Sequence, residues 1–253
     1  VPRGRQLGEL SIAAEEVYPA FSRIVNGYLK VVFLSALMQF YHGRCLEWMA
    51  QFHSTSLLWP AYACACCTYY LYLYTNFSVY MDIVIGLSRL FGFSLPENFD
   101  RPMRSANFLE LWSRWHITLS QWFKSYLFNP IVKGLVRRWP SPRYTPYFGV
   151  IAYFCTFLLM GFWHGTTTVF LIYGLCLGFG VSTNKLYEIA LLKRLGKASV
   201  RSLRANPVYT LFAGAFALAY FAVALTCLWT DFSRLSQLAS ELGIIGFIAA
   251  LLV

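Results

Sequence analysis

The chain has 253 residues, of which 58% belong to the hydrophobic set and 13% are charged. Soluble domains have about 45–50% apolar and about 25% charged residues, so this composition excludes water-soluble, disordered and collagen-like proteins. A spanning helix needs about 20 residues, so the chain can supply roughly six spans. We therefore predict an all-α integral membrane protein.

The net charge and its distribution along the chain indicate whether the partner is a nucleic acid or a membrane. Twenty-one Lys and Arg residues outnumber eleven Asp and Glu residues, and the net charge is +10. On a soluble protein this charge would raise nucleic acid as a partner. Here the basic residues gather between apolar segments, a pattern typical of loops on the cytoplasmic side of a membrane. The expected partner is the lipid bilayer, and no nucleic acid.

The first third of the chain predicts a surface helix and one span. Residues 1–23 are polar, carry Glu9, and predict a helix at the membrane surface; residues 24–41 predict the span. A short, nearly neutral connection with His42 and His53 follows.

The next apolar run, 57–93, is too long for a simple span. As one helix it would measure about 55 Å, against roughly 30 Å of hydrocarbon. We expect it to break at its most polar point, 75–78, and to line an internal cavity near 76–82. Asp82 either pairs with Arg89, two turns on, or lines that cavity.

Two basic stretches orient the later segments. Residues 101–143 and 185–204 are strongly basic and are predicted to be cytoplasmic, whereas 231–241 is slightly acidic and is placed outside. The predicted spans between them are 147–163 and 169–181, which form a hairpin, and 208–228.

His116 lies within a tryptophan-rich amphipathic pattern. One stripe of a helix over 108–124 holds Trp112, Trp115, Leu119 and Trp122. Such a helix can lie at the membrane interface, with Arg114 towards its polar side. Ser120, four residues after His116, is a candidate hydrogen-bond partner for the imidazole.

His164 ends the apolar run 147–163 and stands beside Trp163 and Gly165. An ionisable group at membrane depth is a functional candidate by default. Neutral imidazole accepts a proton near pH 7, as a general base for a hydroxyl must. In the next segment, Gly174 and Gly178 predict a helix-packing face.

Other chemical motifs are absent from the sequence. Cys64-x-Cys66-Cys67 lacks zinc-like spacing and has no neighbouring His, so no metal site is expected. There is no Walker spacing, no Gly-x-Ser-x-Gly elbow and no His-Glu-x-x-His pair. The chain starts at Val1, and its last apolar segment, 246–253, is short. We expect residues 1–253 to be a single membrane domain from a longer protein, truncated at both ends.

Four segments together resemble the membrane-bound O-acyltransferases, and most closely the bacterial branch of alginate O-acetylases and teichoic-acid D-alanyl transferases. They are Leu95-Pro-Glu-Asn-Phe-Asp-Arg-Pro102, residues 108–122 with Trp115-His116, Met160-Gly-Phe-Trp-His-Gly165, and Tyr74-Thr-Asn-Phe-Ser-Val-Tyr-Met-Asp82. The spacing of 48 residues between His116 and His164 fits the same pattern. This chain resembles the C-terminal two-thirds of a member.

The resemblance implies a ring of helices around a tunnel through a bacterial cytoplasmic membrane, with re-entrant and interfacial helices. A short acyl group, most often acetyl, would pass from a cytoplasmic thioester to a hydroxyl of a cell-envelope polysaccharide. His164 matches the general base and His116 the second histidine. The implied substrate-binding residues are Asn76, Asp82, Arg114, Ser120 and Trp163.

The implied donor is acetyl-CoA or an acyl-carrier protein, with no bound cofactor and with a periplasmic or extracellular acyl-relay protein as a further partner. The sequence departs from the family pattern at Asn76, Val79, Lys124-Ser125 and Asp231. Three alternatives stay open: D-alanyl transfer from a carrier protein, a proton-coupled transporter or export channel using Asp82 and the histidines, and a weakly active scaffold.

Overall fold

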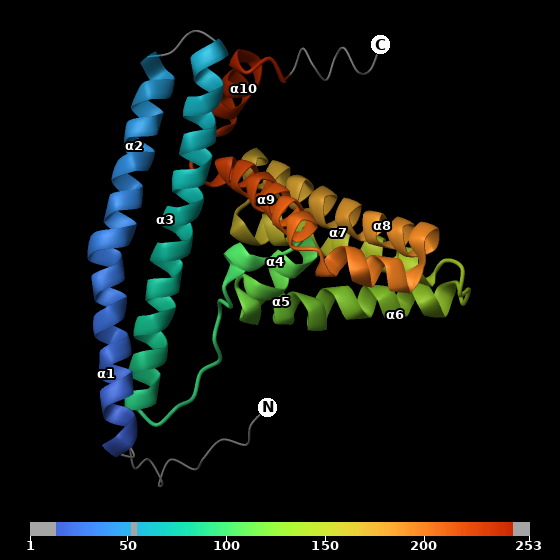
Figure 1. Cartoon of the computed structure of the whole chain (residues 1–253), viewed down its shortest axis with the longest axis horizontal. Helices are drawn as coiled ribbons and strands as arrows, with labels where there is room; N and C mark the ends of the chain where they lie inside the picture. Colours follow the sequence, from blue (N-terminus) through green and yellow to red (C-terminus); the bar gives the residue numbers. More distant parts are fainter. Residues whose placement is uncertain (1–13, 52–54, 245–253) are drawn as a thin grey trace.

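The computed structural model describes residues 14–51 and 55–244, and every regular element within them is a helix (Figure 1). The prediction of an all-α fold is confirmed. The segments long and apolar enough to cross a membrane are Glu16–Gln51, Thr145–His164, Thr168–Ala205 and Pro207–Leu228. The predicted features at Glu9, His53 and 246–253 lie outside the described residues.

Two long antiparallel rods form one side of the molecule (Figure 1). The first rod is α1 (Ala14–Leu29), η1 (Lys30–Ser35) and α2 (Ala36–Gln51) in direct succession. The second rod is α3 (Thr55–Leu90), whose 36 residues measure about 54 Å. Each rod is therefore longer than the roughly 30 Å of a hydrocarbon core.

Two predictions for this hairpin are wrong. The predicted connection around His42 is helical, because α2 continues through it. The predicted break at 75–78 is also absent, since α3 stays helical there. The Thr75 hydroxyl donates to the Leu71 carbonyl oxygen at 2.8 Å and accepts from Ser35 Oγ at 3.0 Å. The polar group that suggested a break is thus satisfied within the hairpin.

A π-helical turn, η1, joins the two halves of the first rod. Its first and last residues, Lys30 and Ser35, both bond to α3, at Asp82 and Thr75. In an α-helix of 3.6 residues per turn, positions five apart point in different directions. The wider π turn closes i→i+5 bonds and so brings both residues onto the face that meets α3.

A second group of helices lies across the rods (Figure 1). They are α4 (Phe108–Arg114), α5 (Ile117–Phe123), η3 (Lys124–Phe128), α6 (Asn129–Arg138), α7 (Thr145–His164), α8 (Thr168–Ala205), α9 (Pro207–Ala224), η4 (Leu225–Leu228) and α10 (Phe232–Glu241). A connector over 91–107, which includes η2 (Pro102–Arg104), leads from α3 to this group. The predicted spans at 147–163 and 208–228 correspond closely to α7 and to α9 with η4.

Glycines set the contact between α7 and α8. A Cβ on Gly161 would come within 2.5 Å of the Gly174 Cα, and one on Gly178 would come within 3.0 Å of the Phe154 carbonyl oxygen. The predicted packing face on α8 is confirmed. Because only backbone fits at Gly161, the position of the α7 C-terminus is fixed by this contact.

α8 is longer than the predicted span 169–181 and turns back on itself. Gly196 has φ 75° and ψ 167°, a left-handed value that favours glycine and interrupts the helix. Beyond it Arg204 Nη2 reaches Glu188 Oε1 at 2.9 Å. The basic stretch 185–204, which was predicted as a loop on the cytoplasmic side, is not a loop, because it lies within the two helical parts of α8.

An aromatic core joins the rods to the second group. Tyr70 of α3 stacks on Trp115, with ring centroids 5.6 Å apart and an interplanar angle of 25°. Phe221 of α9 is fully buried and contacts both rings edge-on, at 5.9 and 5.2 Å. Trp112 of α4 lies 5.4 Å from the same Phe221 ring. This core anchors the turn that carries His116.

Candidate functional site

His116 lies in a sharp turn between α4 and α5. The predicted continuous helix over 108–124 is wrong, because α4 ends at Arg114 and α5 begins at Ile117. His116 has φ 44° and ψ 56°, a left-handed backbone that costs a residue with a Cβ about 1–3 kcal/mol. Such strain persists only where the surroundings enforce it.

Asn98 of the connector enforces the turn. Its side chain is 4% exposed, and its Oδ1 accepts from the Thr118 backbone N–H at 2.9 Å and the Thr118 hydroxyl at 2.7 Å. Its carbonyl oxygen accepts from the Ile117 N–H at 2.9 Å. His116 Nδ1 lies 3.4 Å from the same Oδ1. Asn98 therefore takes the place predicted for Ser120, whose hydroxyl donates to the Trp115 carbonyl oxygen instead.

These contacts define the tautomer of His116. The Thr118 backbone N–H can only donate, so the atom facing it is the Asn98 oxygen, and the 3.4 Å contact with that oxygen favours the tautomer with the proton on His116 Nδ1. Nε2 then keeps its lone pair. The pKa of His116 is lowered to about 4, first because burial removes water from the imidazole and then because a charge on His164 would repel one on His116. His116 is therefore a neutral hydrogen-bond acceptor at pH 7.

His164 is held by aromatic rings. It is the last residue of α7, and the extended backbone of Gly165 ends the helix there. Its ring contacts Trp163 edge-on at 4.9 Å and Tyr173 of α8 at 5.3 Å. Within residues 14–51 and 55–244, no group hydrogen-bonds to either ring nitrogen of His164. The imidazole is exposed, so a ligand can reach it.

The fold brings the two histidines from separate segments into electrostatic range of each other. Each imidazole contacts an aromatic side chain that either belongs to α3 or interacts with a residue of α3. The His116 ring meets Phe77 edge-on at 4.7 Å. Tyr173, which contacts His164, lies within electrostatic range of Tyr69. His116 therefore meets α3 directly, whereas His164 is linked to α3 only through Tyr173.

The other predicted site residues fall into two groups. Trp163 packs on His164, and Ser120 lines a cavity of about 140 Å³ that Lys124 also borders. Arg114 instead bonds to Glu110 of its own helix, at 2.8 Å. Asn76 is exposed, and no contact ties it to either histidine in the described part of the chain.

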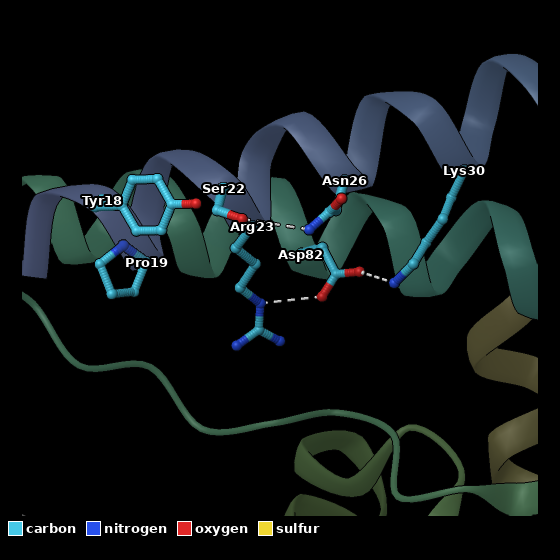
Figure 2. A pocket seen from close by; sticks show the side chains of 7 residues that line it. All are labelled: Tyr18, Pro19, Ser22, Arg23, Asn26, Lys30 and Asp82. Carbon is cyan, nitrogen blue, oxygen red and sulfur yellow. Dashed lines mark hydrogen bonds and ion pairs between the residues drawn. The ribbon is translucent and has the colours of Figure 1, made fainter.

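Asp82 belongs to an ion cluster at the surface of the hairpin. Figure 2 shows Arg23 and Lys30 converging on its carboxylate, at 3.0 and 2.7 Å. Arg23 also binds Glu97 of the connector through two hydrogen bonds of 2.6 Å, which lower the pKa of that carboxyl. Of the two alternatives for Asp82, the pairing with Arg89 is wrong. The adjoining cavity of about 390 Å³ lies open between α1 and α3, so Asp82 lines a surface pocket, and its main role is to tie three segments together.

Sequence reasoning missed a third histidine. His42 of α2 is buried, with Nδ1 3.1 Å from the Ala65 carbonyl oxygen and with no partner for Nε2 among residues 14–51 and 55–244. Its ring lies 5.2 Å from both Tyr69 and Trp229. Only its helical spacing from the apolar residues of α2 could have indicated burial. Asn98 was missed because its role depends on residues about 20 positions away.

These features define the class: an all-α, multi-pass membrane protein with two histidines brought together beside a long aromatic-faced helix. The sequence model of the membrane-bound O-acyltransferase family matches residues 9–213 of the chain. The chain belongs to this family.

Named relatives point in the same direction. The chain is 37% identical to a teichoic acid D-alanyltransferase of Bacillus subtilis over 128 residues, which are 47% of this chain and 32% of the relative. It is 36% identical to a peptidoglycan O-acetyltransferase of Helicobacter pylori over 129 residues, 50% of this chain and 22% of the relative. It is 32% identical to a probable alginate O-acetylase of Pseudomonas fluorescens over 164 residues, 65% of this chain and 30% of the relative. The chain thus spans between about a fifth and a third of these relatives' lengths.

Proposed function

We propose that the full-length protein is a membrane O-acyltransferase that moves a short acyl group from a thioester to a hydroxyl. The observation that carries this proposal is the pair of histidines, one free to bind a ligand and one fixed in a neutral form, within electrostatic range of each other. Membership of the O-acyltransferase family supports the same reaction class.

In this mechanism His164 is the general base. Its free ring nitrogen accepts the proton of the acceptor hydroxyl while the oxygen attacks the thioester carbonyl carbon. The C–S bond then breaks, and the departing thiolate takes the proton back from His164, leaving an ester and a thiol. A positioned base contributes about 10²–10⁴ in rate, and alignment of the two substrates contributes further.

His116 holds the donor rather than reacting with it. Its Nε2 lone pair can accept a hydrogen bond from an amide N–H, a group that coenzyme A and the pantetheine arm of carrier proteins both provide. The cavity of about 140 Å³, which His116 itself does not line, is bordered by Ser120, Trp112 and Thr156. Trp112 Nε1 and Thr156 Oγ1 are buried without a partner in the described part of the chain, so they can bond to a ligand there.

For the finer assignment we propose acetyl as the acyl group and a cell-envelope polysaccharide as the acceptor, in the bacterial cytoplasmic membrane. Two of the relatives, named as a peptidoglycan O-acetyltransferase and a probable alginate O-acetylase, support acetyl. The basic residues of 101–143 suit a cytoplasmic donor, either a nucleotide coenzyme or an acidic carrier protein. A partner on the outer face would complete the transfer.

D-alanine is the second candidate acyl group. It is favoured by the 37% identity to a teichoic acid D-alanyltransferase. The two candidates share the His164 chemistry and differ in the donor. Supplying the full-length protein with acetyl-CoA or with a D-alanyl carrier protein, and measuring which thioester is consumed, separates them.

The test of the reaction class is His164→Ala in the full-length membrane protein. Acyl transfer should fall by about 10²–10⁴ because the base is lost. Phe162→Ala is the matched control, since Phe162 is an exposed side chain near the same helix end. Normal turnover by the His164→Ala protein, at normal expression, would refute the assignment.

A further inference from the structure

A second cavity lies between α8 and α9, away from the histidines. Its volume is about 590 Å³, and neither His116 nor His164 lines it. The lining is mostly aromatic and aliphatic: Phe179, Phe212, Ala213, Phe216, Ala217 and Tyr220. Phe212 and Phe216 are 71% and 74% exposed, which in water would be unfavourable. We name this cavity the α8–α9 groove.

The groove has the length of one lipid leaflet. On α9 its lining runs from Tyr209 to Tyr220, eleven residues further, or about 16 Å along the helix. The hydrocarbon core of a bilayer is about 30 Å thick, so one leaflet contributes about 15 Å. Both helices are among those apolar enough to cross a membrane. An extended acyl chain of one leaflet therefore matches the groove in length and in polarity.

One end of the groove is polar. The Tyr187 and Tyr209 hydroxyls lie 3.3 Å apart, and Arg204 is within electrostatic range of Tyr209. Arg204 keeps 49% of its side chain exposed although it pairs with Glu188. Two hydroxyls and a guanidinium are the groups that bind a phosphate oxygen.

A basic segment surrounds this polar end. Between 189 and 205 the chain carries five basic residues and no acidic one: Lys193, Arg194, Lys197, Arg201 and Arg204. The reversal at Gly196 folds the second half of this segment back towards α8. Clusters of this kind next to a membrane span attract anionic lipid headgroups.

We propose that the α8–α9 groove binds an anionic phospholipid. One acyl chain lies along Phe212 and Phe216, and the phosphate lies by Tyr187, Tyr209 and Arg204. The charge of the segment 189–205 selects an anionic headgroup over a zwitterionic one. This site is independent of the acyl-transfer chemistry, because its lining is separate from both histidines.

The probe is a phosphatidylglycerol with a photoreactive diazirine near the end of one acyl chain, and its phosphatidylcholine analogue is the comparison. The full-length protein is reconstituted in phosphatidylcholine vesicles that contain either probe, illuminated, and mapped by peptide mass spectrometry. We expect labelling within 179–187 and 209–220, with phosphatidylglycerol labelling at least about fivefold more than phosphatidylcholine. Unlabelled phosphatidylglycerol should compete with the wild-type signal, which requires no variant.

Two pairs of variants sharpen the result. Ala213→Trp fills the groove and should abolish the labelling, whereas Ala215→Trp, on an exposed position of the same helix, should leave it intact. Arg204→Gln should reduce the preference for phosphatidylglycerol about fivefold, whereas Arg137→Gln on α6 should not change it. Equal labelling by the two probes, labelling that survives Ala213→Trp, or no labelling because another helix occupies the groove would each overturn the proposal.

Discussion

His116 and His164 differ in almost every local feature although they lie near each other. His116 is partly buried in a strained left-handed turn, and hydrogen bonds through Asn98 define its tautomer. His164 stands at the end of a regular helix, is exposed, and is held only by the rings of Trp163 and Tyr173. One imidazole is committed to a fixed hydrogen-bonding state, and the other has both nitrogens free.

The two environments suit two different tasks: the environment of His116 suits binding of a substrate, and that of His164 suits reaction with it. A group that binds a donor benefits from a fixed orientation and from staying neutral. A general base must gain and lose a proton in each cycle, so it needs free nitrogens and a path to the acceptor. The contrast between the two environments is therefore the basis of the roles that we assign.

The largest expected effect comes from exchanging each histidine for glutamine in the full-length protein. His164→Gln should lower kcat by about 10²–10⁴ with little change in donor KM, because glutamine cannot act as a base. His116→Gln should mainly raise donor KM, by about tenfold, since the amide oxygen replaces the Nε2 acceptor imperfectly. Steady-state kinetics against donor concentration measure both. If both variants lose only kcat, the division of roles is wrong.

Asn98→Ala tests whether the turn really depends on Asn98. Loss of its two short side-chain hydrogen bonds to Thr118 should release the strained backbone of His116 and destabilise the protein by about 1–3 kcal/mol. The bond from the Ile117 N–H to the backbone carbonyl of residue 98 remains. Donor KM should rise as in His116→Gln, while kcat falls less. Asn26→Ala is the control, because the Asn26 amide makes one exposed 3.4 Å contact with Ser22. An Asn98→Ala protein with normal KM would show that His116 is positioned by other contacts.

The elements that sequence predicted well are those governed by local hydrophobicity. The span predicted at 147–163 is α7 within two residues at each end. The break at Trp115–His116 was missed because the apolar stripe continues through it, and the groups that break it come from the connector. At Thr75 the sequence predicted a break that is absent. The polar side chain suggested it, but Ser35 and a carbonyl oxygen of α3 satisfy the Thr75 hydroxyl within the helix.

For the candidate site, too, the sequence indicates what local patterns encode and misses contacts between distant segments. The family pattern marks the two histidines, and it could be recognised from sequence alone. For Asp82 the sequence offered either Arg89 or a cavity, because its partners, Arg23 and Lys30, lie more than 50 residues away in the sequence. Contacts of that range follow from the packing of α1 on α3, which no local pattern encodes.

Asp82→Asn should separate stability from chemistry. We expect a loss of about 1–2 kcal/mol, because Asp82 is only 13% exposed and pairs with two cations, while kcat and donor KM stay unchanged. Thermal unfolding in detergent together with the transfer assay measures both. Glu47→Gln removes an exposed pair with Arg44 and should cost less than about 1 kcal/mol. A strong loss of activity in a stable Asp82→Asn protein would show that Asp82 takes part in substrate binding or catalysis after all.

The smallest expected effect is on pH dependence. The pKa of His116 is about 4 in the folded protein and about 6.5 when unfolded, so the unfolded chain binds more protons between these values. Stability should therefore fall as the pH drops below about 6.5, by less than about 1 kcal/mol between pH 7.5 and pH 6. His116→Gln should remove this part of the slope in unfolding experiments at the two pH values. An unchanged slope would mean that His116 is not desolvated.

The π turn at Lys30–Ser35 has a consequence for how the first rod could evolve. It holds one more residue than a regular turn would, and its wider helix absorbs that residue because it rotates the chain less per residue. Deleting a single residue there would restore a regular helix and leave the two halves of the rod in nearly the same rotational phase. Arg23 and His42 would then both still face α3. The loss would be local, because Lys30 and Ser35 could no longer both reach their partners Asp82 and Thr75.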